Sequence, residues 1–525
     1  MKRSIIAFAI TLLTLHAGAQ LTNPILPGFH PDPSICRVGN DYYMVNSSFQ
    51  YFPGVPIFHS RDLKNWEQVG NVLTRESQLK LTDATSWQGI YAPTLRYLPP
   101  REGSQEPGRY YMITTNVGQA EHPESANFLV WATSPEGPWS EPVWLKQGGI
   151  DPSLLFDDNG RCYMVSNPNN TITLCQIDPA TGKQLTPSRP IWQGTGGRYP
   201  EGPHIYKKDG YYYLLISEGG TELAHSLTMA RSRSIYGPYE ACPKNPILTH
   251  CRVGAQDSPI QGTGHGDLVQ DTQGRWWMVF LAYRNYNGAY HQLGRETFIA
   301  PVEWPKDGWP VVNGGMPIEA QQRTPVHRRY DFDAPLGPEW VYIQNPDSAM
   351  YLVHNGQMRL HGSRFSLVEN KRPTFVGLRQ ESATFVMDTK ITAHDLADGD
   401  EAGLCVYQMH NGNVQCFLAN YRDILRLRVR LNLKGLKPLL VDKNVPNTDN
   451  LWLRVESDSK NYSFYYSTDG EKYLWLESID CSLLSTETVG GFTGAMLGIY
   501  CFQGNNKYQA GRPFADFDYV EYTEQ

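Results

Sequence analysis

The stretch Gly28-Phe29-His30-Pro31-Asp32-Pro33-Ser34-Ile35 leads through the turn Gly39-Asn40-Asp41 into the aromatic pair of Tyr42-Tyr43-Met44. A glycine-bearing turn before such a pair is typical of a hairpin that enters a buried β-strand. Prolines flank Asp32, and each proline fixes its own φ and favours an extended conformation in the residue before it. We therefore expect Asp32 to lie on rigid, extended backbone, which suits a catalytic carboxylate.

The same turn and aromatic strand recur along the first 300 or so residues. The five strands are Tyr42-Tyr43-Met44, Tyr110-Tyr111-Met112, Cys162-Tyr163-Met164, Tyr212-Tyr213-Leu214 and Trp276-Trp277-Met278. Similar all-strand units without an amphipathic helix are typical of propeller blades. The pattern predicts an all-β protein whose residues 20–315 form a five-bladed β-propeller.

Titratable residues stand at a nearly constant distance before four of these strands. Asp32 lies 11 residues before Tyr43, and Asp151, Glu201 and His265 each lie 12 residues before Tyr163, Tyr213 and Trp277. The second unit has Tyr91-Ala92-Pro93 at this place. Because the innermost strands of a propeller line its central channel, we expect three acids and a histidine to converge there. Carboxylates that repel one another at one place indicate a functional site.

The remaining chain has a different pattern. A polar stretch without periodicity, residues 316–330, is predicted to be a linker. Beyond it, Leu425-Arg426-Leu427-Arg428-Val429-Arg430-Leu431 and Leu451-Trp452-Leu453-Arg454-Val455 alternate strictly, and Asp469-Gly470 marks a hairpin turn. Residues 331–525 are therefore predicted to form a β-sandwich, with the alternating arginines on its solvated face.

Composition and the N-terminus restrict the class of function. The net charge of −7 and the absence of a basic run argue against nucleic acid or an anionic membrane as partner. Residues 1–19 combine Lys2-Arg3, an apolar run and Ala17-Gly18-Ala19, as a signal peptide does. The run is too short to span a bilayer, so we expect no membrane insertion and a protein exported to the periplasm or secreted.

The sequence leaves disulfide pairing and oligomeric state open. Nine cysteines occur without a Cys-x-x-Cys pair, and burial as small side chains is the simpler interpretation. Disulfides between Cys405 and Cys416, or between Cys242 and Cys251, are the alternatives.

Two carboxyl groups that face each other across a pocket can hydrolyse a glycosidic bond, one protonating the leaving oxygen and the other activating water. The longer reach of Glu201 suits the proton donor, and the rigidly held Asp32 suits the base. Asp151 is then left to modulate the pKa of the donor.

Five motifs together resemble glycoside hydrolase family 43, of the β-xylosidase and α-L-arabinofuranosidase type. They are Gly-Phe-His-Pro-Asp-Pro-Ser at 28–34, Ile-Asp-Pro-Ser-Leu at 150–154, Glu-Gly-Pro-His at 201–204, Gly-His-Gly-Asp at 264–267 and Leu-Gly-Arg-Glu-Thr-Phe at 293–298. The resemblance extends over the C-terminal sandwich. It implies an inverting mechanism with Asp32 as general base, Glu201 as general acid and Asp151 as pKa modulator.

The resemblance also implies further substrate-binding residues. Arg295 is expected to reach the sugar, Phe49 and Tyr91 to form pocket walls, and Phe492 to close one side from the sandwich. Tyr91 stands where relatives commonly have Trp. His265 is similar to a channel histidine that in some members lies near a calcium ion or a water cluster. A structural calcium and a simple hydrogen-bonded histidine are thus both open, and no cofactor is required.

We predict an exo-acting inverting glycosidase that releases terminal α-L-arabinofuranose from plant hemicellulose oligosaccharides. The smaller wall at Tyr91 and the short segment between Tyr283 and Arg295 favour a furanose and a branched backbone. The alternatives are a β-D-xylosidase on xylo-oligosaccharides, dual activity, an endo-acting arabinanase or xylanase, and a non-catalytic carbohydrate-binding propeller. Three converging acids argue against the binding protein, and a sandwich that walls the site argues against endo action.

Overall fold

The computed structural model describes residues 21–525 except 83, 119–125, 253, 256, 423, 446–450 and 505–511. The described chain is dominated by strands, so the all-β prediction is confirmed. Its one α-helix is the single turn α1 (Thr486–Val489), beside the 3₁₀ turns η1 (Asn313–Gly315), η2 (Ser348–Met350) and η3 (Cys481–Leu484). No helix in these residues is long and apolar enough to cross a membrane. The predicted signal peptide, residues 1–19, lies outside the described residues.

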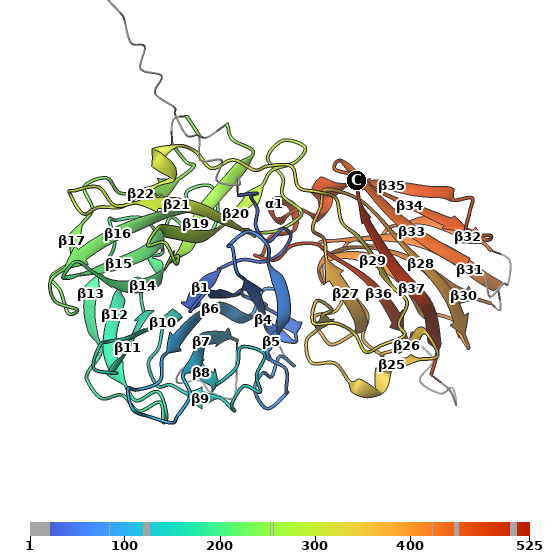
Figure 1. Ribbon diagram of the computed structural model, residues 1–525. Coiled ribbons are helices and arrows are strands. Elements are labelled where there is room, and N and C mark those ends of the chain that lie inside the picture. The colour runs from blue at the N-terminus through green and yellow to red at the C-terminus, as the bar shows by residue number, and fades with distance from the viewer. Residues whose placement is uncertain are drawn as a thin grey trace, which may run out of the picture.

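Five antiparallel sheets follow one another in the N-terminal half (Figure 1). The first contains β1 (Ser34–Val38), β2 (Asp41–Val45), β4 (Gly54–Ser60) and β5 (Glu67–Leu73). The second contains β6 (Gly89–Leu98), β7 (Arg109–Val117), β8 (Asn127–Ala132) and β9 (Val143–Trp144). The third contains β10 (Ile150–Phe156), β11 (Cys162–Asn167), β12 (Ile172–Ile177) and β13 (Arg189–Trp192).

The fourth sheet contains β14 (Glu201–Lys208), β15 (Tyr211–Glu218), β16 (Ser226–Ser232) and β17 (Glu240–Ala241), with β18 (Leu248–Thr249) also paired to β16. The fifth contains β19 (Ile260–Gln270), β20 (Trp276–Arg284), β21 (Glu296–Glu303) and β22 (Val311–Val312). The predicted aromatic pairs all fall on the second strand of a sheet. The first strands are neighbours in the order β1, β6, β10, β14 and β19, and β19 also contacts β1.

The C-terminal half consists mainly of two larger sheets, coloured from yellow to red in Figure 1. One contains β23 (His327–Tyr330), β25 (Tyr351–His354), β26 (Gln357–His361), β28 (Thr384–His394), β33 (Leu451–Asp458), β34 (Asn461–Ser467), β35 (Leu474–Asp480) and β37 (Phe514–Glu524). The other contains β27 (Thr374–Arg379), β29 (Glu401–Met409), β30 (Gly412–Tyr421), β31 (Ile424–Leu433), β32 (Leu439–Asn444) and β36 (Met496–Phe502). Apolar side chains from both sheets form one shared core.

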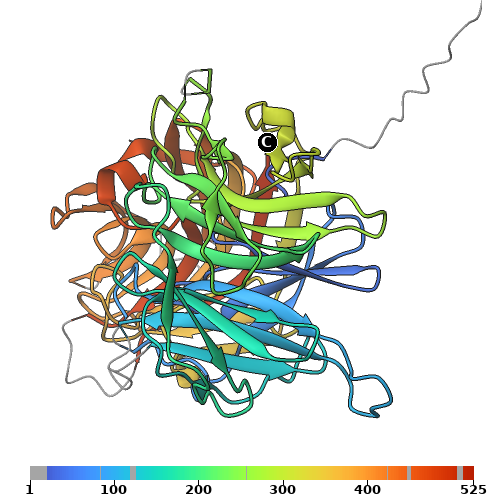
Figure 2. The ribbon, with the colours of Figure 1, turned by 90° about the vertical axis from the view of Figure 1, so that its left-hand side faces the viewer.

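The predicted linker 316–330 is only partly irregular. Its last residues form β23, which pairs with β37 at the far end of the chain. A separate strand pair joins the N-terminal and C-terminal halves, because β24 (Tyr342–Ile343) pairs with β3 (Tyr51–Phe52). Phe29, Phe49 and Tyr51 also share a core with residues of β27, β29 and β36. This strand pair and this shared core show that the halves are packed together, and in Figure 2 the C-terminal strands lie behind the N-terminal sheets.

Two further expectations can be compared with the structure. Arg426, Arg428 and Arg430 are not freely solvated, since their side chains are only 19–20% exposed and pair with Asp442 or Glu401. They nevertheless alternate with the buried core residues Leu427, Val429 and Leu431, so they lie on the outer face of the sheet as predicted, ion-paired rather than free. All nine cysteines are free thiols, and eight of them are buried, so the simpler interpretation holds and neither disulfide forms.

Candidate active site

The acids lie on irregular backbone at the inner ends of the first strands. Asp32 has φ 53°, Ala92 31°, Asp151 52°, Gly202 58° and His265 44°, all in the left-handed region. The expectation of an extended Asp32 is therefore wrong. In β6, β10, β14 and β19 the pairing register shifts at this point, which is the mark of a β-bulge. Such bulges re-aim side chains, and strained φ values cluster at functional sites.

Glu201 is not at the place equivalent to Asp151. Glu201 pairs with Ser217 just before the register shift, as Ile150 pairs with Asn167 in the preceding sheet. The left-handed position after Glu201 is taken by Gly202, where a Cβ would approach the His265 ring to 3.0 Å. Counting back from the aromatic strands missed this offset because the two hairpins differ in length by one residue. Tyr163 pairs with Leu155, eight residues before it, whereas Tyr213 pairs with Tyr206, seven residues before it.

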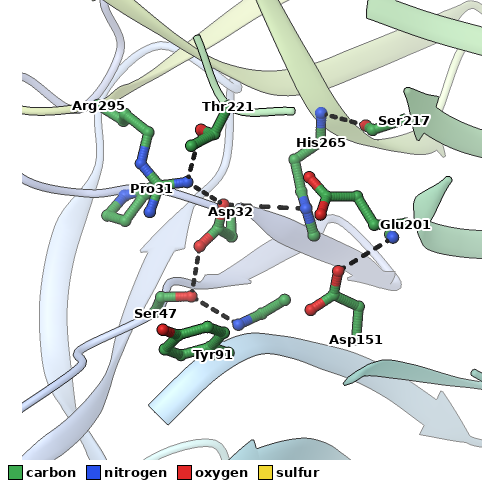
Figure 3. A network of polar contacts seen from close by, with 12 residues as sticks. Pro31, Asp32, Ser47, Tyr91, Asp151, Glu201, Ser217, Thr221, His265 and Arg295 are labelled. Atoms are coloured by element: carbon green, nitrogen blue, oxygen red, sulfur yellow. Dashed lines mark hydrogen bonds and ion pairs between the residues drawn. The ribbon is translucent and has the colours of Figure 1, made fainter. Parts of the chain in front are cut away.

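The pocket nevertheless contains every residue predicted for the site. A cavity of about 360 Å³ is lined by Asp32, Phe49, Tyr91, Asp151, Glu201, His265, Arg295 and Phe492, together with Ala92, Ile150, Tyr199, Gly220, Thr221 and Glu222. Figure 3 shows that Asp32 and Glu201 reach it from different sheets, with Asp151 and His265 beside Glu201. The sequence-predicted residues are therefore brought together in space.

Asp32 is buried but held in its ionised form. Arg295 Nη1 donates to its Oδ1 (3.1 Å), and the Ser47 hydroxyl donates to its Oδ2 (2.6 Å). Burial raises the pKa of Asp32, but the charge of Arg295, the nearby His265 and the Ser47 hydrogen bond outweigh it and leave the pKa lowered. A buried, ionised carboxylate with one oxygen on a cation is suited to accept a proton from water.

Asp151 has the opposite electrostatic environment. Its Oδ2 accepts a hydrogen bond from the Gly202 amide at 3.1 Å. Burial and then the negative charges of Glu201 and Asp32 raise its pKa well above the ordinary value. Asp151, beside Glu201, therefore tends to retain its proton, while Asp32 opposite is ionised. This difference between carboxyl groups is what acid and base roles require.

His265 lies between the two sides. Its backbone amide donates to the Ser217 hydroxyl (2.6 Å), and its Nδ1 is 3.8 Å from Asp32 Oδ1. Burial lowers the pKa of His265, so the ring is neutral at neutral pH despite the nearby carboxylates. A neutral ring leaves Arg295 as the cation in contact with Asp32.

Aromatic side chains from both halves form one wall. Phe49 lies 4.8 Å from Tyr91 and 6.5 Å from Phe492 between ring centroids, and the Arg295 guanidinium stands over Phe49 and Phe492. The Tyr91 hydroxyl donates to the Trp87 carbonyl (2.6 Å), which fixes its ring. Flat apolar rings beside hydrogen-bonding groups are the usual lining of a small-ligand pocket.

Several site residues had no signal in the sequence. Ser47 connects the Asp32 carboxylate to β6 by donating to Asp32 and accepting from the Ala92 amide (2.6 Å). Thr221 accepts a second hydrogen bond from Arg295 (3.1 Å), and Glu222 and Tyr199 line the outer cavity. All four lie in loops without a recurring motif, so only the folded chain reveals them.

A metal ion at His265 has no fitting donor set among the described residues. They contain no group of three His, Cys, Asp or Glu side chains that could hold an ion. Calcium also prefers oxygen ligands to an imidazole nitrogen. The calcium ion near His265 stays a prediction, and no step of the reaction is assigned to it.

A sugar-sized pocket in which an ionised carboxylate faces two further carboxyl groups, one of them with a raised pKa, is typical of glycoside hydrolases. Comparison with known families agrees. Residues 21–310 match the family described as glycosyl hydrolases family 43, and residues 329–523 match the β-xylosidase C-terminal concanavalin A-like domain. The chain belongs to glycosyl hydrolase family 43, which confirms the resemblance seen in the sequence.

Relatives with both specificities cover almost the whole chain. A xylosidase/arabinosidase from Butyrivibrio fibrisolvens is 39% identical over 96% of this chain and 99% of its own. A non-reducing end α-L-arabinofuranosidase from Bacteroides ovatus is 38% identical, covering 96% and 95%. Among solved structures, a xylan β-1,4-xylosidase from Bacillus halodurans superposes with a TM-score of 0.86 at 35% identity, covering 96% and 100%. The family is thus shown, while the names of the relatives divide between two substrates.

Proposed function

We propose that this glycosidase is exo-acting and inverting, with Asp32 as general base, Glu201 as general acid and Asp151 as modulator of the acid. The observation that carries the proposal is the contrast between Asp32, whose pKa is lowered, and Asp151 beside Glu201, whose pKa is raised. One side of the pocket can accept a proton while the other still has one to give.

The reaction moves two protons in opposite directions. Asp32 takes a proton from water as the water oxygen bonds to the anomeric carbon. The bond from that carbon to the leaving oxygen breaks, and Glu201 gives its proton to the leaving oxygen. Arg295 keeps Asp32 ionised and presents its remaining donors to the sugar hydroxyls. Attack from the face opposite the leaving group inverts the anomeric configuration.

The proposed architecture is a closed five-bladed propeller over residues 20–315, a linker over 316–330 and a sandwich over 331–525. The order of contacts among β1, β6, β10, β14 and β19 supports the propeller. It explains why acids far apart in sequence meet at one cavity. Phe492 from the sandwich half supports exo action, because a wall there limits the pocket to a terminal sugar.

For the substrate we propose terminal α-L-arabinofuranose on hemicellulose oligosaccharides. Tyr91 offers a smaller flat surface than Trp, and its tethered hydroxyl prevents it from moving to stack on a six-membered ring. The Bacteroides ovatus relative, named a non-reducing end α-L-arabinofuranosidase, supports this choice. The second candidate is terminal β-D-xylose, supported by the match of residues 329–523 to a β-xylosidase domain.

The test is a comparison of kcat/KM on 4-nitrophenyl α-L-arabinofuranoside and β-D-xylopyranoside. We expect the arabinofuranoside to be the better substrate. A tenfold preference for the xyloside, about 1.4 kcal/mol in the transition state, would overturn the choice of sugar. If the protein binds both glycosides but hydrolyses neither, the alternative of a non-catalytic carbohydrate-binding protein would be favoured.

The location follows from the N-terminal residues alone. We propose that residues 1–19 direct export to the periplasm or the medium and are removed before Gln20. N-terminal sequencing of the protein from cell fractions tests this. A cytoplasmic protein that retains Met1 would contradict it.

A further inference from the structure

We infer that His225 is a positioning residue that holds the catalytic proton on Glu201, an inference that rests on the proposed role of Glu201. His225 immediately precedes β16 and is 1% exposed. Its Nε2 lies 3.6 Å from Glu201 Oε1 and has no hydrogen-bond partner among the described residues. A buried nitrogen without a partner is costly, so this one needs an explanation.

The other ring nitrogen fixes the tautomer. His225 Nδ1 lies 3.1 Å from the Gly262 carbonyl oxygen, which can only accept a hydrogen bond. Nδ1 must therefore carry the hydrogen, and in the neutral ring Nε2 presents a lone pair to Glu201. Gly264 makes room for the ring, since a Cβ there would lie 2.2 Å from a ring carbon. The fold thus builds a fixed acceptor that is aimed at Glu201.

A fixed acceptor distinguishes between the two states of Glu201. An ionised Oε1 would face a lone pair and gain nothing, whereas a protonated Oε1 can donate to Nε2. The distance of 3.6 Å exceeds a hydrogen bond by a few tenths of an ångström, and contacts in active sites shorten when substrate binds. His225 therefore favours the proton-loaded acid.

Delivery of the proton requires only a rotation. The terminal torsion of a glutamate is broad and two-fold, so a turn of the carboxyl group directs the same O–H into the pocket. The O–H bond of Glu201 then breaks as an O–H bond forms on the leaving oxygen, and no proton is transferred to His225. The other titratable groups that interact with this carboxyl are Asp151, His265 and Tyr91.

The test compares two substitutions. His225→Asn can keep the hydrogen bond to Gly262 but removes the acceptor at Nε2. His225→Gln extends an amide to the place of Nε2 and keeps an acceptor there. For each variant, kcat/KM is measured against pH on the better 4-nitrophenyl glycoside and on the corresponding methyl glycoside, which has a poor leaving group.

We expect His225→Asn to move the alkaline limb of kcat/KM down by about one pH unit, which is about tenfold in activity on that limb. The loss should be larger on the methyl glycoside, because its leaving oxygen depends on the acid. His225→Gln should keep the limb nearer to the wild type. A uniform loss at all pH values and on both substrates, or identical limbs in both variants, would mean a merely structural role and overturn the inference.

Controls separate this inference from the proposed function. His250 is equally buried and also bonds a carbonyl through Nδ1, at 2.7 Å from Ile260, so His250→Asn should lower stability and leave the limb unchanged. Glu201→Gln with full activity on the methyl glycoside would refute the acid itself. An inactive Glu201→Gln with an unmoved limb in His225→Asn would refute only the role of His225.

Neutron diffraction of the wild type gives a test that does not depend on a folded variant. The expected density has hydrogen on His225 Nδ1 and on Glu201 Oε1, pointing at Nε2. A hydrogen on Nε2 would overturn the inference.

Discussion

Ser47→Ala should shift the acidic limb of the pH profile of kcat/KM, although Ser47 makes no contact with the pocket where the sugar would bind. Ser47 does not line the cavity, but its hydroxyl donates to Asp32 Oδ2 at 2.6 Å. A hydrogen bond to a charged group contributes about 1.5–3 kcal/mol, and one pKa unit corresponds to about 1.4 kcal/mol. Because Arg295 still contacts the other oxygen, we expect the lower end of this range, about one unit.

The sign follows from the role of the base. Burial raises the pKa of Asp32, and Arg295, His265 and Ser47 lower it further than burial raises it, so removing Ser47 raises it. In its proposed role as base Asp32 works when ionised, so activity should be lost as the pH falls through this pKa. The acidic limb of kcat/KM should move to higher pH by about one unit, with about a tenfold loss well below the limb.

Ser34→Ala is the matched control for this experiment. Ser34 donates to Asp267 (2.7 Å) and accepts from the Leu95 amide (3.0 Å), as Ser47 donates to Asp32 and accepts from the Ala92 amide (2.6 Å). Each substitution leaves one buried backbone amide unpaired, at a cost of about 1–3 kcal/mol. Only Ser47→Ala should move the acidic limb of kcat/KM. A folded Ser47→Ala protein with the wild-type limb would refute the electrostatic account of Asp32.

Four further outcomes are expected. Asp32→Asn and Glu201→Gln should each fold and lose about 10²-fold or more in kcat/KM, and full activity in either would remove that residue from the reaction. Glu201→Gln should lose least on a dinitrophenyl glycoside, whose leaving group needs little protonation; equal losses would move the acid role elsewhere. Phe492→Ala should raise KM by opening the wall formed from the sandwich half, and an unchanged KM would show that this wall does not contact sugar. Tyr91→Trp should shift the ratio of activities toward the xyloside, whereas an unchanged ratio would mean that Tyr91 does not set specificity.

Local patterns predicted much of the architecture. The turns before Tyr42 and Tyr110 and the alternation after Leu425 depend on neighbours in sequence, so the strands they announce are present as β2, β7 and β31. The convergence of Asp32, Asp151 and Glu201 was predictable because the repeats place them near the same end of successive sheets. Each of these signals is contained in a few residues that are adjacent in the sequence.

Features that depend on folded geometry were missed. The left-handed φ of Asp32, two residues before β1, is the opposite of what the following proline favours. The offset between Glu201 and Asp151 comes from hairpin lengths, which simple counting ignores. Ser47 and His225 contact the acids across 15 and 24 residues of chain, and nothing in their local sequence announces this.

Proton NMR of the first sugar released tests the central claim most directly. If Asp32 activates water opposite a leaving group protonated by Glu201, the anomer that appears first has the configuration opposite to that of the substrate, and mutarotation produces the other later. Release of the anomer with the original configuration would instead require a covalent intermediate and would contradict the roles assigned to both acids.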